Sequence, residues 1–132
     1  MKTIPSLLAV IAVTIFVGCS TASRHRDFTG IPATDFTVSV KCGEPNMRFT
    51  GTIVSDGHTE HLSGLGSGTF HISGHEVICA FKKTDAAGRI SLTISKGDTH
   101  VGDAISDETY GGVRAELLYT PEQRHTLFTS FR

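Results

Sequence analysis

Apolar and polar residues alternate repeatedly from Phe36 to Tyr119. Alternation at every second residue is typical of a β-strand with one buried face, because successive side chains point to opposite faces of a sheet. The pattern recurs in seven or eight short segments, and Gly/Asp turns such as Ser55-Asp56-Gly57 and Lys96-Gly97-Asp98 separate them. The alternation therefore predicts an all-β protein with antiparallel strands.

The phase of the alternation also predicts the core. The residues that share a buried face are Phe36, Val38, Val40 and Cys42; Met47, Phe49, Gly51 and Ile53; Val77, Cys79 and Phe81; Ile90, Leu92 and Ile94; and Val113, Ala115, Leu117 and Tyr119. Lys82 and Lys83 are expected to leave the core. We predict an antiparallel β-sandwich of roughly immunoglobulin size over residues 34–120, with a small closed barrel as the alternative. Residues 121–132 are expected to form a final edge strand or a tail.

The N-terminal segment has a different character. Lys2 precedes a run of apolar residues from Leu7 to Val17, and small residues follow the run. The run is about half of the roughly twenty residues that a membrane-spanning helix needs. A short basic start, an apolar centre and a small-residue boundary are typical of a secretory signal. We therefore predict that residues 1–18 are a signal peptide that is cleaved after export.

Three cysteines stand at positions 19, 42 and 79. Thiols of exported proteins are usually oxidised, so we expect a disulfide between Cys42 and Cys79. Closing such a loop would stabilise the fold by roughly 4 kcal/mol in the chain-entropy model. A Cys–His metal site and a reactive thiol are the alternatives. The expected disulfide leaves Cys19 without an internal partner.

The stretch Phe16-Val17-Gly18-Cys19 resembles the lipobox of bacterial lipoproteins. The resemblance implies cleavage before Cys19 and attachment of diacylglycerol to its thiol, which anchors a protein to a membrane without crossing it. In lipoproteins of Gram-negative bacteria, Ser20 rather than Asp at the next position favours the periplasmic face of the outer membrane. Cleavage after Ala22 is the alternative, and it would release a soluble periplasmic or secreted protein.

Residues 19–33 are expected to form the lipidated N-terminus and a flexible tether, because they are mostly polar and show no periodicity. Loss of Lys2 with the signal leaves 11 Lys and Arg against 13 Asp and Glu, a formal charge near −2. The only basic cluster in the sequence is Arg24-His25-Arg26. Nucleic-acid binding requires a larger basic surface, so we predict no nucleic-acid partner.

The seven histidines are the main candidates for metal chemistry. His71 and His75 lie four residues apart around Ser73-Gly74, and Glu76 follows directly. A tight hairpin would bring these three side chains together into a weak Zn²⁺ or Cu²⁺ site. Solvated strand and loop histidines are the simpler interpretation, so we predict no bound metal and no cofactor.

The sequence also lacks the usual signatures of an enzyme. It contains no G-x-S-x-G motif, and no helix follows Gly64-Leu65-Gly66-Ser67-Gly68 to form a phosphate-binding loop. Asp107 and Glu108 are adjacent in a predicted turn, where their side chains would diverge rather than face each other across a cleft. We therefore predict a protein that is not an enzyme.

Together these features predict a lipid-anchored envelope lipoprotein that acts as a small binding, accessory or structural module. A protein partner would add to one of its exposed strand edges. An inhibitor of an envelope hydrolase such as lysozyme and a periplasmic metal-binding protein are the alternative functions. The pattern makes no prediction of strand order or oligomeric state.

Overall fold

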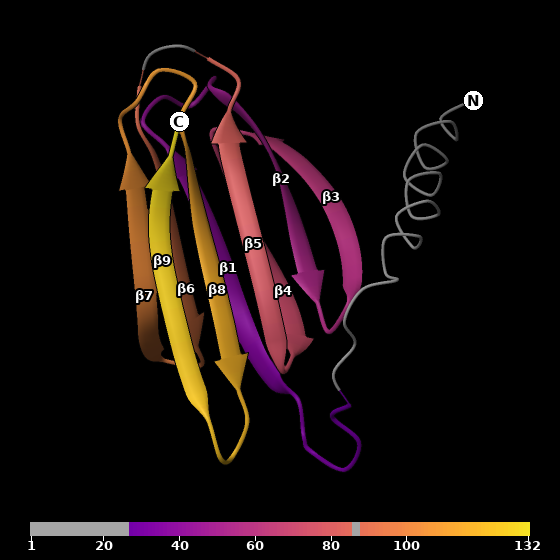
Figure 1. Ribbon diagram of the computed structural model, residues 1–132. Helices are drawn as coiled ribbons and strands as arrows, with labels where there is room; N and C mark the ends of the chain where they lie inside the picture. The colour runs from indigo at the N-terminus through magenta and orange to yellow at the C-terminus, as the bar shows by residue number, and fades with distance from the viewer. Residues whose placement is uncertain (1–26, 86–87) are drawn as a thin grey trace, which may run out of the picture.

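The computed structural model describes residues 27–85 and 88–132, so the predicted signal, Cys19 and most of the tether lie outside the described residues. The described residues form strands and turns but no helix, and so none that could cross a bilayer. The strands, shown in Figure 1, are β1 (Thr34–Cys42), β2 (Arg48–Ser55), β3 (His58–Leu65), β4 (Ser67–Gly74), β5 (Glu76–Lys83), β6 (Ile90–Lys96), β7 (Thr99–Ser106), β8 (Gly112–Tyr119) and β9 (Arg124–Phe131).

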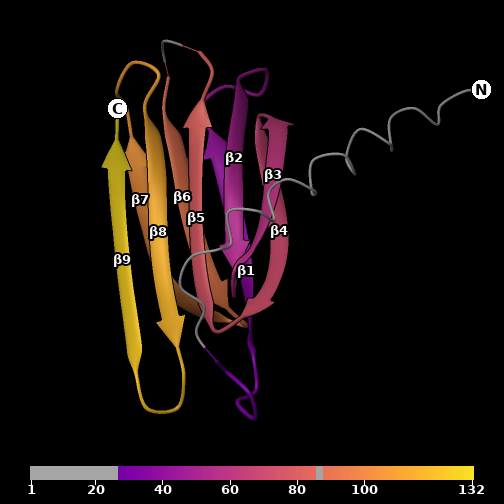
Figure 2. The same cartoon turned by 45° about the vertical axis from the view of Figure 1, so that its right-hand side comes forward.

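The strands form two antiparallel sheets packed face to face. The hydrogen-bonded order is β7-β6-β1-β4-β3-β2-β5-β8-β9. The order bends between β3 and β4, which are paired only at Leu65 and Ser67. One sheet is therefore β7-β6-β1-β4 and the other β3-β2-β5-β8-β9, and Figure 2 shows β3 and β4 together at the side where they join. The terminal strands β7 and β9 are not paired with each other in this order, so the predicted sandwich is confirmed over its closed alternative.

Local turn chemistry sets the hairpins. The β2–β3 turn has positive φ at both Asp56 (49°) and Gly57 (85°), the conformation that a two-residue hairpin turn needs to match the twist of its strands. Asp and Gly accept this backbone more readily than other residues. The turn aligns Ser55 with His58 and sets the β2–β3 register through to Arg48 and Leu65.

The inner faces of the two sheets form one core, and the predicted phase of the alternation is confirmed along its length. The largest side chains in it are Phe36, Phe49 and Phe81, all at most 1% exposed. The Phe49 and Phe81 rings meet edge to face, with centroids 6.0 Å apart. The other buried members include Val38, Val40, Met47, Ile53, Val77, Ile90, Leu92, Ile94, Val113, Ala115 and Leu117.

The structure has more strands than the seven or eight that we predicted. The additional strand is β9, which the sequence left open as an edge strand or a tail. Strand β9 belongs to the sandwich because Phe128 packs against the core. A Cβ atom at Gly102 of β7 would lie 2.3 Å from the Phe128 ring, so this glycine allows β7 and β9 to approach.

The expectation that Lys83 leaves the core is wrong. Lys82 is exposed, but Lys83 is fully buried because it continues the inward phase of Val77, Cys79 and Phe81 along β5. Its ammonium group donates a hydrogen bond to the carbonyl oxygen of Gly88. A buried amine needs such a partner, and the backbone of the neighbouring loop provides it.

The expected Cys42–Cys79 disulfide is not formed in the structure, where both thiols are buried and free. Cys79 lies in the middle of β5, paired across the strands with Ile53 and Ala115. Cys42 ends β1, where its amide donates to the carbonyl of Gly66, and the Gly66 amide donates in turn to the carbonyl of Met47. Arg48, the next residue, accepts a hydrogen bond from the amide of Thr84, so this level of the core is that of Lys83 at the end of β5. Four residues of strand separate Cys79 from Lys83, roughly 13 Å, which is beyond the reach of a disulfide. Both cysteine side chains point into the core, but they lie at different positions along the length of the strands.

Alkylation with iodoacetamide tests the state of these thiols. Burial raises the pKa of Cys79 to about 12 and also raises the pKa of Cys42, which suppresses the reactive thiolate. We expect no labelling of either residue in the native protein at pH 8, and complete labelling of both in urea without a reductant, measured by peptide mass spectrometry. A cross-linked Cys42–Cys79 peptide would contradict the structure.

Candidate functional site

The outer face of the β3-β2-β5-β8-β9 sheet carries a hollow of about 530 Å³. Its polar lining comes from side chains that point away from the core, in the opposite phase to Phe49 and Phe81. Strand register places Ser63, Thr50, Lys82, Gly112 and Phe131 in one row across the five strands. Four residues of this row line the hollow: Ser63, Thr50, Lys82 and Phe131. The next row adds His61, Thr52 and Ala80, and Gly51, Leu62 and Phe81 complete the lining.

Small residues in the middle of the sheet explain why the surface is concave. Ala80 and Gly112 present little or no side chain between the taller residues of β3, β5 and β9. A Cβ atom at Gly112 would lie 2.4 Å from the Phe131 ring, so this ring lies directly over the glycine. Phe131 therefore forms an aromatic wall of the hollow, and His61 lines it from β3.

A second hollow of about 570 Å³ adjoins the first and shares Thr50 and Ser63 with it. It is also lined by Arg48, Leu65 and Thr84, and Leu65 is 57% exposed. We call the two hollows together the outer groove. From Arg48 to Thr52 it follows β2 for four residues, or roughly 13 Å.

The outer groove lies toward the end of the sandwich opposite the entry of the N-terminal segment. Arg48 begins β2, Lys82 is next to the end of β5, and Phe131 ends β9. The segment that leads into β1 lies at the opposite end of the strands, and Figure 1 shows it in indigo and purple, far from the C-terminus. A tether that precedes residue 27 would therefore leave the groove facing away from its attachment point.

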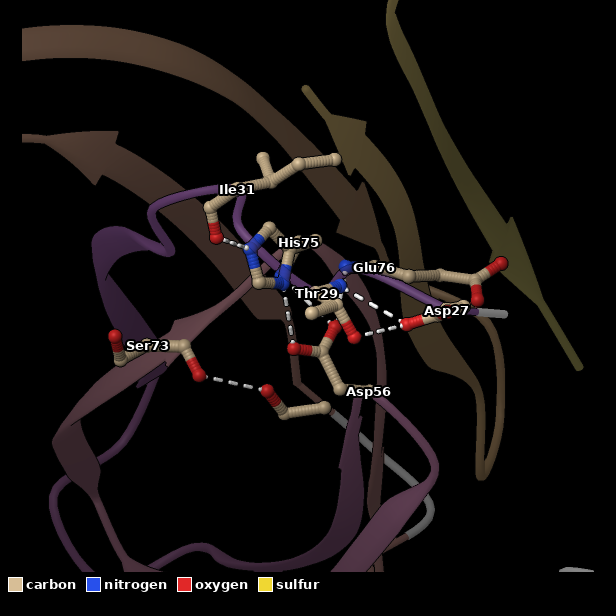
Figure 3. A network of polar contacts seen from close by, with 8 residues as sticks. Asp27, Thr29, Ile31, Asp56, Ser73, His75 and Glu76 are labelled. Carbon is tan, nitrogen blue, oxygen red and sulfur yellow. Dashed lines mark hydrogen bonds and ion pairs between the residues drawn. The ribbon is translucent and has the colours of Figure 1, made fainter. Parts of the chain in front are cut away.

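A second cluster of polar contacts occurs where the N-terminal segment meets the sandwich (Figure 3). His75 stands between β4 and β5 and is only 7% exposed. Its Nδ1 lies 2.8 Å from Oδ2 of Asp56, and its Nε2 lies 2.6 Å from the carbonyl oxygen of Ile31. The other carboxylate oxygen, Oδ1 of Asp56, accepts hydrogen bonds from the backbone amides of His75 and Glu76, both at 2.8 Å.

These contacts require a positively charged imidazole at His75. A carbonyl oxygen and an ionised carboxylate only accept hydrogen bonds, so both ring nitrogens must donate. The hydrogen bond to Asp56, followed by the one to Ile31, raises the pKa of His75. Partial burial opposes ionisation of Asp56, but the amide of Glu76 and the ring and amide of His75 outweigh it and lower the pKa of this carboxyl.

The charged His75 ring holds the N-terminal segment against the sandwich. Phe28 stacks on the His75 ring with centroids 4.4 Å apart and planes 14° apart. The Ile31 amide bonds back to the carbonyl of Phe28, and Thr29 donates its amide to Asp27 Oδ1 at 3.0 Å. The end of the predicted flexible tether, from residue 27, is therefore a structured turn that packs on the domain.

The structure does not bring the candidate metal ligands together. His71 faces solvent, with its Nδ1 3.4 Å from the hydroxyl of Thr37 on the neighbouring strand. The His75 ring and the backbone amide of Glu76 bind Asp56 instead. Within residues 27–85 and 88–132, no group of three His, Cys, Asp or Glu side chains is placed to hold a metal ion.

No known family, characterised protein or solved structure matches this chain. Of the predicted site residues, Cys19 lies outside the described part of the chain, and Cys42 and Cys79 belong to the core. Sequence reasoning missed the outer groove, because its residues come from β2, β3, β5 and β9 and are assembled only by strand order.

The His75 network predicts a pH dependence of stability. A raised folded-state pKa stabilises the fold fully below the unfolded value near 6.5, and this contribution is lost as the pH rises through the folded value. Each unit by which the folded-state pKa exceeds the unfolded-state pKa contributes about 1.4 kcal/mol to the free energy of unfolding. We expect His75→Gln to reduce the decline in unfolding free energy above pH 6.5, measured by urea denaturation. His125→Gln on β9, which removes an exposed histidine, is the control. Equal pH profiles of unfolding free energy for the wild type and His75→Gln would contradict the charged state of His75.

Proposed function

We propose that this chain is a lipid-anchored lipoprotein of a bacterial envelope that binds a ligand or partner in its outer groove. The proposal is based on the position of the groove, which lies on the half of the sandwich farther from the N-terminal segment. A module attached through its N-terminus would present this surface to the surrounding compartment. The proposed site of attachment is Cys19, on the periplasmic face of the outer membrane.

Two further features support a binding role. The core is filled with side chains, including three phenylalanines that are at most 1% exposed, so the binding surface has to be on the outside. The groove combines a rigid sheet with a concave surface and a few polar groups, as ligand sites usually do.

The adjacent Asp107 and Glu108 bind different partners, Arg89 and Arg132, so they do not act together as a carboxylate pair.

Lipid labelling tests the anchor. We expect the full-length chain, expressed in a Gram-negative host, to incorporate labelled palmitate and to fractionate with the outer membrane. Cys19→Ser should abolish both, because it removes the thiol that receives the diacylglycerol. Cys42→Ser should leave both unchanged and is the matched control. A soluble wild-type protein whose mature chain begins at Ser23 would overturn the anchor.

Photo-cross-linking in intact cells tests the groove. A photoreactive residue placed at Ser63 should give a discrete adduct with an envelope component, because Ser63 lines both hollows of the groove. The same residue placed at Thr93 on the opposite sheet should give none. Equal cross-linking at the two positions, or none at Ser63, would overturn the proposed binding surface.

A further inference from the structure

The outer groove is positively charged, although the mature chain as a whole is slightly acidic. Arg48 and Lys82 line its two hollows, and the lining contains no Asp or Glu. Across β2 and β5, Thr50 is opposite Lys82, which makes Arg48 and Lys82 diagonal neighbours about 7–8 Å apart at the backbone. Neither cation has a side-chain partner among the described residues. Their potentials therefore add over the groove and favour an anion.

The remaining lining suits a ligand that has hydroxyl groups and an apolar face. Thr50, Thr52 and Ser63 present side-chain hydroxyls, each of which can donate and accept hydrogen bonds. The Phe131 ring, held over Gly112, adds a flat apolar surface at one wall. A simple phosphate or carboxylate would use the cations and the hydroxyl donors but would leave the Phe131 ring without a role.

We propose that the outer groove binds an anionic oligosaccharide, a short sugar chain that carries carboxylate or phosphate groups. The acidic groups pair with Arg48 and Lys82, the sugar hydroxyls bond to the threonine and serine side chains, and one sugar ring packs on Phe131. The groove follows β2 for roughly 13 Å, which is long enough for more than one sugar unit. This inference rests on the proposed binding role of the groove and specifies its ligand.

An NMR titration of the mature protein, purified from the envelope in a neutral detergent, tests the inference with tetragalacturonate as the probe. We expect saturable shifts of the Thr50, Ser63 and Lys82 amides, weaker binding at high salt, and no saturable shifts with neutral maltotetraose. Loss of two charge-assisted contacts in the double variant Arg48→Gln/Lys82→Gln should weaken binding by at least about tenfold.

Lys41→Gln/Lys96→Gln is the matched control, because it removes the same charge from exposed positions of the opposite sheet. It should change the affinity by less than about twofold. Equal binding of maltotetraose, an equal effect of the two double variants, or equal binding of inorganic pyrophosphate or phosphatidylglycerol vesicles would overturn the inference. Cross-linking at Ser63 in cells without any shift from tetragalacturonate would overturn the sugar class alone and leave the proposed binding surface standing.

Discussion

The contact between the inner faces of two antiparallel sheets holds this protein together. Burial of apolar surface is the main favourable term in folding, and here it is concentrated in alternate residues of β1, β2, β5, β6 and β8. The large rings of Phe36, Phe49 and Phe81 fill the space between the sheets. Because the interior is occupied, the chemistry available for recognition is confined to the outer faces and to the ends of the strands.

The two ends of the sandwich are built differently. At one end, a charged imidazole at His75 connects three separate parts of the chain through Asp56, Ile31 and the Phe28 ring. Both ring nitrogens face acceptors, so the proton on His75 is part of the structure. Toward the other end, Arg48 and Lys82 are exposed and unpaired among the described residues. One end fixes the chain in place, whereas the other leaves charge available for a ligand.

Several elements could be predicted from the sequence because their causes are local. The Asp56-Gly57 turn follows from the backbone preferences of its two residues, and the buried faces of β1 and β6 follow from alternation. Lys83 and Cys42 show where local reasoning fails. The charge of Lys83 argued for the surface, but the inward phase of β5 buried it beside a carbonyl acceptor. Cys42 and Cys79 share that inward phase, yet the level of each in the core depends on how the two sheets are stacked.

The all-β class, most of the core residues and the position of the tightest turn follow from the order of amino acids alone, because these depend on neighbours along the chain. The strand order, the attachment of the N-terminal segment through His75 and the outer groove arise only in the folded chain. Each of these depends on pairing between residues far apart in sequence, such as Ile31 with His75 and Thr50 with Lys82. Alternation specifies which face of a strand is buried, but it carries no information on which strand lies beside it.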